Sequence, residues 1–289
     1  MNSEFKNHNS KLIVITGPTA VGKTAEAIRL ARELGSEVIS CDSRQFYREL
    51  RIGVARPSIE ELSSVPHHFI ACRSVAEPYN ISTYEQDALT LIAELHRRMA
   101  TVVVVGGSGL YIDALLHGVS RMPDPTPELR QQMQALPLDQ KRLLLQRVDP
   151  DSYARVDLRN PVRLQRALEV YYMTGRPYSA VVAESRQAAR PFEAEVRVLQ
   201  LPTADLRHRI DRRVDAMISE GLLEEVRSLL PFRHLNTLNT VGYRELFPVL
   251  DGTATLTEAI QAVKLNTWHY ARKQLTWMRR YSSTTATPT

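Results

Sequence analysis

The sequence predicts an α/β protein with a P-loop three-layer core, a parallel sheet and an inserted all-helical domain. Continuous apolar runs rich in β-branched residues, at 11–16 and 101–107, are typical of strands buried on both faces of a parallel sheet. Segments with helical spacing alternate with these runs, which favours helices on the sheet faces. The stretch from 121 to about 189 carries no strong strand pattern, and we expect it to be helical.

The first expected strand, "KLIVIT" at 11–16, leads into a glycine-rich turn, "GPTAVGKT" at 17–24. "TAEAIRLARELG" then has apolar residues at helical spacing and stops at Gly35, a residue suited to a helix C-terminus. The elements expected next are a strand at 37–42, a helix at 84–100 and a strand at 101–107.

The sequence pattern changes after Gly118, where the proline-rich segment "RMPDPTPELR" begins the helical stretch. The run "EVRVLQLP" at 195–202 resembles a strand that returns to the first sheet, so the helical stretch is interpreted as an insertion. From Asp205 onward the pattern is helical again. The expected organisation is a core of 11–118 and 195–280, an insertion of 119–194, and disordered tails at 1–10 and 281–289.

Composition is that of an ordinary globular protein, with 43% hydrophobic and 24% charged residues. No run approaches the ~20 apolar residues that cross a bilayer, and the polar N-terminus lacks the apolar segment of a signal peptide. Cys41 and Cys72 are the only cysteines, too few for a disulfide framework or a metal-ligand set. We therefore expect a cytoplasmic protein with no membrane partner. A monomer is also expected.

The net charge of +5 is compatible with nucleic acid but also with many unrelated enzymes. Its distribution is more informative. The segment 264–280 holds five Lys or Arg and no acid, interleaved with Trp268, Tyr270 and Trp277. The span 163–213 is rich in arginine, which suits bidentate phosphate contacts.

"GPTAVGKT" matches the P-loop pattern and lies between an expected strand and an expected helix, the context this motif requires. Gly17 and Gly22 would let backbone N–H groups wrap a phosphate at the helix N-terminus. Lys23 would reach a terminal phosphate oxygen, and Thr24 would help to hold Mg²⁺. The alternative is a glycine-rich turn without a ligand.

The expected strand at 101–107 runs into "GGSGLY", and no acidic residue follows until Asp113. An ordinary P-loop NTPase has an aspartate after such a strand to organise Mg²⁺, so this pattern counts against a standard NTPase. Asp42 ends the strand at 37–42 and should lie beside the P-loop, at the edge of the sheet where ligands bind. Its carboxylate suits a general base, a metal ligand, or a simple N-cap for the next turn.

Several longer blocks occur together and in one order. They are "GPTAVGKT", "DSRQFYRELRIGVARP", "VVVGGSGLYIDALLHG", "NPVRLQRALEVY", "TVGYRE" and "ARKQLTWMRR". In these blocks, spanning about 11 to 280, the chain resembles bacterial tRNA dimethylallyltransferases. The resemblance implies transfer of the dimethylallyl group of dimethylallyl diphosphate to N6 of the adenosine immediately 3′ of the anticodon. It also implies a P-loop core with a helical insertion.

The resemblance further implies that the P-loop grips the diphosphate leaving group, with Mg²⁺ as cofactor. The expected diphosphate-binding residues are Gly17, Thr19, Ala20, Val21, Gly22, Lys23, Thr24, Arg209 and Arg213. The two arginines are four residues apart on an expected helix, so both can point one way or both can lie on a solvated face. Asp42 matches the general base of the family, and Ser108 supplies a hydroxyl where many members have threonine. A tight turn is the alternative for the glycines around Ser108.

The expected partner is the anticodon stem-loop of tRNA. The residues that match segments contacting tRNA are Asp42, Ser43, Arg44, Gln45, Arg130, Val162, Arg163, Leu164, Gln165 and Arg166. The basic and aromatic helix at 264–280 is expected to follow the RNA backbone, with burial of its tryptophans in the core as the alternative. An amphipathic helix with exposed arginines is the alternative for the segment around Arg163.

Three other functions remain open. An isopentenyltransferase acting on free adenine nucleotides would need no helical insertion. A small-molecule P-loop kinase would consume ATP and transfer phosphate. A non-catalytic RNA-binding ATPase would bind RNA in an ATP-dependent way and form no covalent product.

Overall fold

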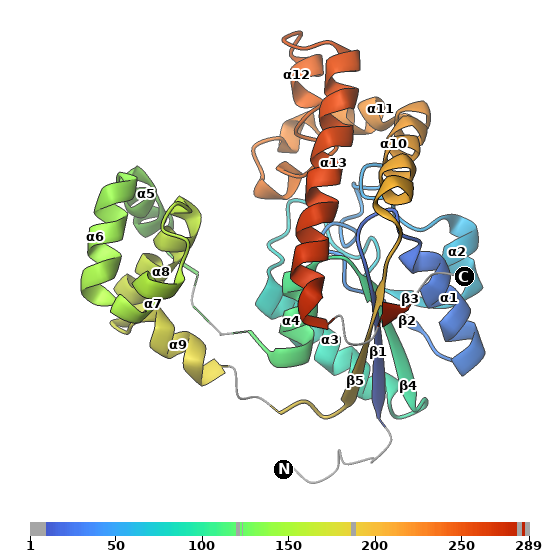
Figure 1. Ribbon diagram of the computed structural model, residues 1–289, viewed down its shortest axis with the longest axis horizontal. Helices are drawn as coiled ribbons and strands as arrows, with labels where there is room; N and C mark the ends of the chain where they lie inside the picture. Colours follow the sequence, from blue (N-terminus) through green and yellow to red (C-terminus); the bar gives the residue numbers. More distant parts are fainter. Residues whose placement is uncertain (1–9, 120–121, 123, 186–188, 282–284, 287–289) are drawn as a thin grey trace. The chain divides into compact units, whose positions relative to one another are not determined.

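The computed structural model describes residues 10–119, 122, 124–185, 189–281 and 285–286. The chain forms two compact units, one from 1–116 together with 190–289 and one from 117–189 (Figure 1). The boundaries expected from the sequence lie at 118/119 and 194/195. Of the expected tails, 1–9 and most of 282–289 lie outside the described residues.

The larger unit is built on a sheet of six parallel strands in the order β3-β2-β4-β1-β5-β6. The strands are β1 Lys11–Thr16, β2 Val38–Ser40, β3 His67–His68, β4 Thr101–Gly106, β5 Glu193–Leu199 and β6 Thr285–Ala286. β1 lies between β4 and β5, and Val14 is paired with Val104 on one side and Val196 on the other. The expected return of the 195–202 run to the first sheet is therefore confirmed.

Helices cover both faces of this sheet. They are α1 Lys23–Leu34, α2 Ile59–Ser64, α3 Ile81–Leu95 and α4 Gly109–His117. Ile13 and Ile15 of β1 pack with α1 on one face, whereas Leu12 and Val14 pack with α3 and α4 on the other. Alternation of side chains along each buried strand thus feeds two separate cores. The predicted three-layer α/β core is confirmed.

The second half of the larger unit is helical. Its elements are α10 Thr203–Ser219, α11 Leu222–Ser228, α12 Phe247–Leu250 and α13 Leu256–Met278, with 3-10 turns at Leu230–Phe232, Asn236–Leu238 and Arg279–Tyr281. In Figure 1, α13 runs as one long helix beside α10. The two helices pack through Ile210 and Ala271, which together with Ala20 bring them against the P-loop.

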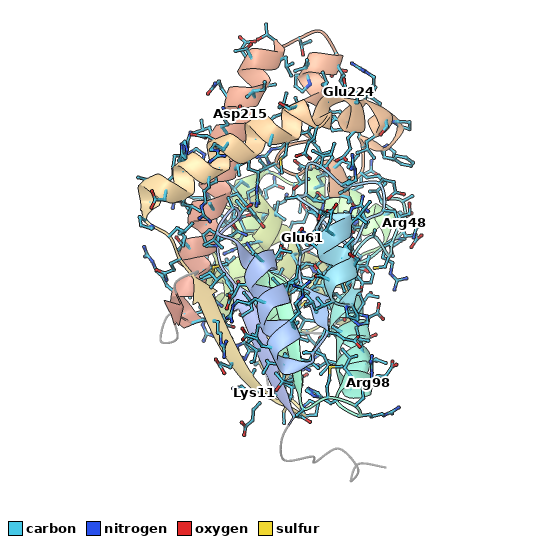
Figure 2. The ribbon with its side chains drawn as sticks, turned by 90° about the vertical axis from the view of Figure 1, so that its right-hand side faces the viewer. Lys11, Arg48, Glu61, Arg98, Asp215 and Glu224 are labelled. Atoms are coloured by element: carbon cyan, nitrogen blue, oxygen red, sulfur yellow. The ribbon has the colours of Figure 1, made fainter. Side chains whose placement is uncertain are left out.

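All strands of the sheet run in one direction, so its two ends are distinct. Figure 2 places Lys11, the first residue of β1, at the lower end of the strands, with Arg98 also at this end. Arg48 and Glu61 lie towards the opposite end, where the strands finish and where α10 crosses above them. Ligands bind at the carboxyl edge in open parallel sheets, so a ligand site is expected there.

The smaller unit contains helices alone among its described residues, as the sequence predicted. They are α5 Pro127–Ala135, α6 Leu138–Val148, α7 Pro150–Arg155, α8 Pro161–Thr174 and α9 Tyr178–Ser185. Its core centres on Met133, Leu145, Leu164 and Leu168. The buried carboxylate of Asp149 joins the unit by accepting hydrogen bonds from the backbone of its own helix start and from Ser179.

Several boundaries differ from the expected ones, for local reasons. α3 begins at Ile81, before the predicted 84, because the Asn80 side chain caps it by accepting from the Thr83 N–H at 3.0 Å. It ends at Leu95 rather than 100. The strand β3 was not predicted, because a two-residue edge strand leaves no periodic signal. The strand β6 falls inside the segment expected to be a tail.

Candidate active site

The glycine-rich segment forms a loop between β1 and α1 in which two residues adopt left-handed backbone conformations. Gly22 has φ 104° immediately before the helix, and Ala20 has φ 67°. These angles curl the backbone around the N-terminus of α1. A loop of this kind, closed by a helix N-terminus, aims N–H groups at an anion. The predicted turn and helix start are thus found together.

Lys23 folds back over this loop. Its Nζ donates to the carbonyl oxygens of Gly17, at 3.0 Å, and Pro18, at 2.8 Å. Burial lowers the pKa of this ammonium group to about 8, although the carboxylate of Asp42 acts in the opposite direction. The lysine is therefore held at the loop by weak neutral acceptors, and an anionic ligand would be a stronger partner for it.

Two arginines on α10 contact the same loop. Arg213 donates from Nη1 to the hydroxyl of Thr19 at 3.2 Å, and Arg209 lies 3.5 Å from the carbonyl oxygen of Val21. Burial lowers the pKa of the Arg213 guanidinium from its ordinary value. Their spacing of four residues places both on one face of the helix, and that face is turned to the P-loop. Arg213 is half-buried against the loop, whereas Arg209 is exposed, so the solvated-face alternative still applies in part to Arg209.

Asp42 lies just after β2, in a turn that begins with its own side chain. Its Oδ1 accepts from the backbone N–H of Arg44 at 3.0 Å, so the capping role considered from the sequence is present. Within the described part of the chain, Oδ2 has no hydrogen-bond partner. Asp42 also lines the cavity described below. One carboxylate oxygen therefore shapes the turn while the other is available to a ligand.

Ser108 connects this turn to the loop after β4. Its Oγ accepts from the N–H of Ser43 at 3.1 Å and lies 3.2 Å from the Ser43 hydroxyl. Ser108 is 8% exposed. It also begins α4, since its carbonyl oxygen accepts from Tyr111 and Ile112. The glycines around Ser108 therefore do form a tight turn, and that turn places a hydroxyl next to the residue that follows Asp42.

A cavity of about 780 Å³ opens between these elements. The P-loop, Asp42 and Arg213 line it, and so do both apolar and charged side chains from 51–62 and α10. Its lining residues are Thr19, Ala20, Gly22, Lys23, Thr24, Ala25, Asp42, Gln45, Arg51, Ile52, Val54, Ala55, Arg56, Pro57, Ser58, Ile59, Glu61, Leu62, Arg213, Ala216, Met217, Glu220, Tyr270 and Gln274. The P-loop and apolar side chains of 52–62 thus line the same cavity.

The wall formed by 51–53 is held by a residue of α11. The carboxylate of Glu225 accepts from the backbone N–H groups of Arg51, Ile52 and Gly53, at 3.2, 2.8 and 3.1 Å, and from the hydroxyl of Tyr243 at 2.6 Å. Burial, with the adjacent Glu225, raises the pKa of Tyr243. A single side chain therefore fixes one wall of the cavity to the C-terminal helices.

Thr24 lines the cavity beside Lys23. No cluster of three or more His, Cys, Asp or Glu that could hold a metal is found among the described residues. A metal at this site would therefore take few protein ligands. Asp113, the first acid after β4, does not face the P-loop. It accepts hydrogen bonds from Trp277, Arg280 and Tyr281 instead.

The expected tRNA-contacting residues of the larger unit differ in whether their side chains are already hydrogen-bonded within the protein. Gln45 is committed within the protein: its Nε2 lies 3.3 and 3.1 Å from the carbonyl oxygens of Val54 and Ala55, and its Oε1 accepts from Ser40. Its amide therefore holds the cavity wall rather than presenting both groups to a base. Arg44 follows Asp42 in the same turn and is half-buried.

The others lie in the smaller unit. Arg130 is exposed on α5, and Val162 and Arg163 are exposed in the first turn of α8. Gln165 donates to Glu169 at 2.8 Å, and Arg166 lies 3.8 Å from the same carboxylate. Leu164 is fully buried in the core of this unit, so its side chain offers no surface to a ligand.

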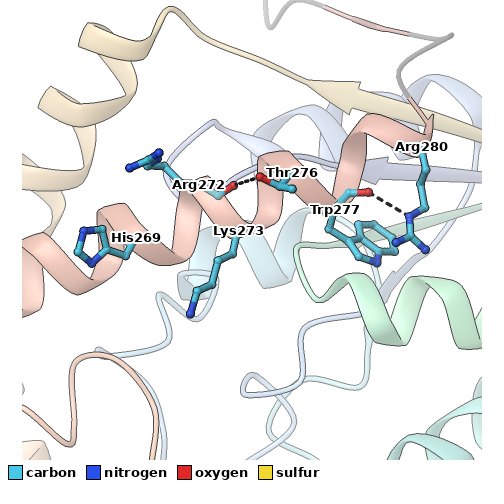
Figure 3. A pocket seen from close by; sticks show the side chains of 6 residues that line it. All are labelled: His269, Arg272, Lys273, Thr276, Trp277 and Arg280. Carbon is cyan, nitrogen blue, oxygen red and sulfur yellow. Dashed lines mark hydrogen bonds between the residues drawn. The ribbon is translucent and has the colours of Figure 1, made fainter. Parts of the chain in front are cut away.

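The basic segment of α13 forms a separate surface. A shallow cavity of about 530 Å³ is lined by His269, Arg272, Lys273, Thr276, Trp277 and Arg280. Figure 3 shows His269, Arg272 and Lys273 extending away from the helix axis. Trp277 is partly buried, because its ring packs against Gly109 and its indole N–H donates to Asp113. The core alternative considered for this tryptophan is thus partly realised.

Sequence reasoning missed the cavity residues that come from distant segments. Gln274 was treated only as part of a basic helix, and Ile52 and Met217 carry no local sign of a site. Leu164 could have been recognised as a core residue, because Leu164, Ala167 and Leu168 follow the i, i+3, i+4 pattern of a buried helix face.

The fold and the site together define a P-loop α/β protein in which no acid stands at the end of β4. A family model described as IPP transferase matches residues 45–281. The chain belongs to this family of transferases. Among its relatives is tRNA dimethylallyltransferase 1 of Bacteroides thetaiotaomicron, 44% identical over 273 residues, which covers 93% of this chain and 88% of the relative.

Solved structures of transferases that act on tRNA are also similar to this chain. The tRNA isopentenylpyrophosphate transferase of Bacillus halodurans is 35% identical, with a TM-score of 0.70 and coverage of 96% of this chain and 90% of that one. A eukaryotic dimethylallyltransferase acting on tRNA is 28% identical, with a TM-score of 0.80 and coverage of 93% and 70%. No described helix of the present chain is long and apolar enough to span a membrane.

Proposed function

We propose that this protein transfers the dimethylallyl group of dimethylallyl diphosphate to N6 of the adenosine 3′-adjacent to the anticodon in tRNA, releasing diphosphate. One observation carries the proposal beyond family membership. A single cavity joins a P-loop with Lys23 and Arg213 to the carboxylate of Asp42, and no Walker-type acid accompanies the loop. That combination suits departure of a diphosphate better than attack on a γ-phosphate.

The donor's diphosphate would be bound by the P-loop. Backbone N–H groups between Gly17 and Thr24, the hydroxyl of Thr19 and the cations of Lys23, Arg209 and Arg213 lie at or next to this loop. Negative charge builds on the diphosphate as the allylic carbon–oxygen bond breaks. Preorganised N–H groups and cations aimed at this charge lower the barrier without reorganisation.

Mg²⁺ fits this site through the hydroxyl of Thr24, which lines the cavity next to the loop. Mg²⁺ keeps several waters and binds substrate phosphates rather than an all-protein cage, so a site with few protein ligands is compatible with it. When bound, the ion would neutralise part of the charge on the diphosphate.

The dimethylallyl group would lie against the apolar part of the cavity. Ile52, Val54, Leu62 and Met217 are apolar residues of its lining. An apolar wall shields the allylic carbon from water while the bond to the diphosphate breaks. Hydrolysis of the donor would be disfavoured for the same reason.

Asp42 would act as the general base. The lone pair of the adenine N6 amine is delocalised into the ring, which makes the amine a poor nucleophile. The new bond forms between N6 and the allylic carbon, the carbon–oxygen bond to diphosphate breaks, and the N6 proton passes to the carboxylate. Ser108 would orient the acceptor through its hydroxyl, which lies beside Ser43 in the same turn.

The tRNA would be held by basic side chains outside the cavity. A base stacked in an anticodon loop must be extruded to reach a carboxylate inside a cavity. We propose phosphate or base contacts for Arg44 and Ser43 in the larger unit, and the basic face of α13 would follow the backbone. In the smaller unit the proposed contacts are Arg130, Val162, Arg163, Gln165 and Arg166. Gln45 and Leu164 would act indirectly, by holding these segments in shape.

We also propose that the protein acts as a monomer in the cytoplasm, the compartment of its proposed tRNA substrate. The test is incubation with labelled dimethylallyl diphosphate, Mg²⁺ and either unmodified tRNA or AMP. We expect label in tRNA, and nucleoside mass analysis should find one added dimethylallyl group on the adenosine 3′ of the anticodon. Label in AMP alone would favour the free-nucleotide alternative, and phosphate transfer from ATP would favour a kinase.

A further inference from the structure

Gln274 joins two loops of the site that are remote in sequence. It lies on α13 and is 7% exposed. Its Oε1 accepts from the backbone N–H of Thr19 in the P-loop at 2.8 Å, and its Nε2 donates to the carbonyl oxygen of Gly107 at 2.8 Å. One partner is only a donor and the other only an acceptor, so they fix which way the amide faces. Both the oxygen and the nitrogen of the amide are therefore hydrogen-bonded within the protein.

The chain after β4 is shaped to receive this side chain. A Cβ at Gly107 would come within 2.4 Å of the Gln274 Nε2, so glycine is needed for the approach. A Cβ at Gly109 would come within 2.2 Å of the Trp277 ring, one turn further along α13. α13 is thus packed directly on the "GGSG" turn at two successive points. Small movements of this helix would move the turn with it.

The two loops have different roles in the proposed reaction, one on the side of the donor diphosphate and the other on the side of the proposed base. Thr19 lies in the loop proposed to hold the leaving diphosphate, and its hydroxyl also meets Arg213. Gly107 precedes Ser108, whose hydroxyl is bonded to Ser43, the neighbour of Asp42. The diphosphate loop is therefore connected to the turn that carries the proposed base by the two hydrogen bonds of Gln274, the Gly107–Ser108 peptide link and the hydrogen bond between Ser108 and Ser43.

We propose that Gln274 is a positioning residue, which holds the diphosphate loop at a fixed distance from the Ser108 turn and so aligns donor and acceptor. This inference rests on the proposed function. A displacement of 1 Å between reacting groups costs roughly 10²-fold in rate, whereas each half-site can still bind its own ligand. Loss of Gln274 should therefore affect the rate of transfer more than the affinity for diphosphate.

The first test needs no turnover. Hydrogen exchange is measured for peptides covering 17–24 and 106–112, with and without inorganic pyrophosphate and Mg²⁺. In the unaltered protein pyrophosphate should slow exchange in both peptides. In Gln274→Met, which keeps a side chain of similar length without polar atoms, protection should remain in 17–24 and be lost in 106–112. Gln261→Met, an exposed glutamine on the same helix, is the matched control.

A second variant guards against misfolding of the first. Gln274→Glu keeps an acceptor for the Thr19 N–H but opposes a carboxylate oxygen to the Gly107 carbonyl. It should lose protection in 106–112 in the same way. Equal protection of both peptides in both variants would overturn the proposal, as would protection confined to 17–24 in the unaltered protein.

The third measurement is the single-turnover rate with unmodified tRNA and saturating dimethylallyl diphosphate. Gln274→Met should lower this rate by about 10- to 100-fold, with the dissociation constant of pyrophosphate changed by less than about threefold. A fall in pyrophosphate affinity as large as the fall in rate would assign Gln274 to the diphosphate loop alone. No transfer by the unaltered protein, with pyrophosphate still protecting both peptides, would refute the proposed function but keep the coupling between the loops.

Discussion

Replacing Glu225 by alanine tests how firmly the cavity wall is held. The change removes four acceptor contacts, three to backbone N–H groups of 51–53 and one to the hydroxyl of Tyr243. A hydrogen bond to a charged group is worth about 1.5–3 kcal/mol, but the four are not additive, because loop N–H groups can turn to water. The buried Tyr243 hydroxyl cannot do so readily. We therefore expect a loss of about 2–4 kcal/mol in the free energy of unfolding.

Urea unfolding followed by tryptophan fluorescence measures this loss of stability in the larger unit, to which Glu225 belongs. The chain has two tryptophans, and both Trp268 and Trp277 lie on α13 in the larger unit. Glu224→Ala is the matched control, because this neighbouring carboxylate is 66% exposed and lies 3.9 Å from Arg227. It should change stability by no more than about 0.5 kcal/mol. Glu225→Gln keeps one acceptor oxygen and should fall between the two.

The wall also borders the proposed donor site, so the same variant should weaken the binding of dimethylallyl diphosphate, measured by calorimetry. Pyrophosphate, which lacks the apolar group, should lose less affinity. If Glu225→Ala and Glu224→Ala unfold at the same urea concentration with the same slope, Glu225 does not hold the wall. The structural argument for the 51–53 loop would then be wrong.

Three further outcomes are expected. Asp42→Asn keeps an acceptor for the Arg44 N–H, so the turn should survive while single-turnover prenyl transfer falls by about 10²–10⁴-fold; a rate within tenfold would exclude the general base. The lowered pKa of Lys23, about 8, means that this lysine loses its proton above pH 8 in the free protein. Pyrophosphate affinity, measured by calorimetry, should then fall by about tenfold per pH unit above that value, whereas Lys23→Arg should abolish this lysine-dependent fall. Gly53→Ala would put a Cβ within 2.5 Å of the Tyr243 ring and should cost about 1–3 kcal/mol in the tryptophan unfolding assay; an unchanged midpoint would show that the ring gives way freely.

The P-loop illustrates what consecutive residues can specify. Its glycines, its lysine and the helix that follows are adjacent in the chain, and local backbone preferences are enough to bring them together. The buried strands were predictable for a similar reason, because their apolar runs need cover on both faces. The boundaries of α3 were less well predicted, since a single capping side chain at Asn80 decides where it begins.

Individual side chains of the site were harder to interpret. Gln45 lies in a segment that matches a tRNA-contacting block, yet its amide nitrogen donates to the carbonyl oxygens of the 54–55 backbone. Asp42 was described from the sequence as a base, a metal ligand or a cap. In the structure one of its oxygens caps the turn, and the same residue lines the cavity. Which polar atom of a side chain is bonded within the protein, and which is left for a ligand, depends on side-chain positions that a local sequence pattern does not specify.

The sequence by itself determined the layered α/β core, the phosphate loop and the absence of an acid after β4, because each depends on neighbouring residues. Only the tertiary structure decided what surrounds that loop. Gln274 is 255 positions away from Thr19, and Arg213 is 194 positions away. Glu225 is 172 to 174 positions from the wall it holds. These contacts arise when α10, α11 and α13 pack against the carboxyl end of the sheet, and packing of distant segments has no periodic trace in the chain.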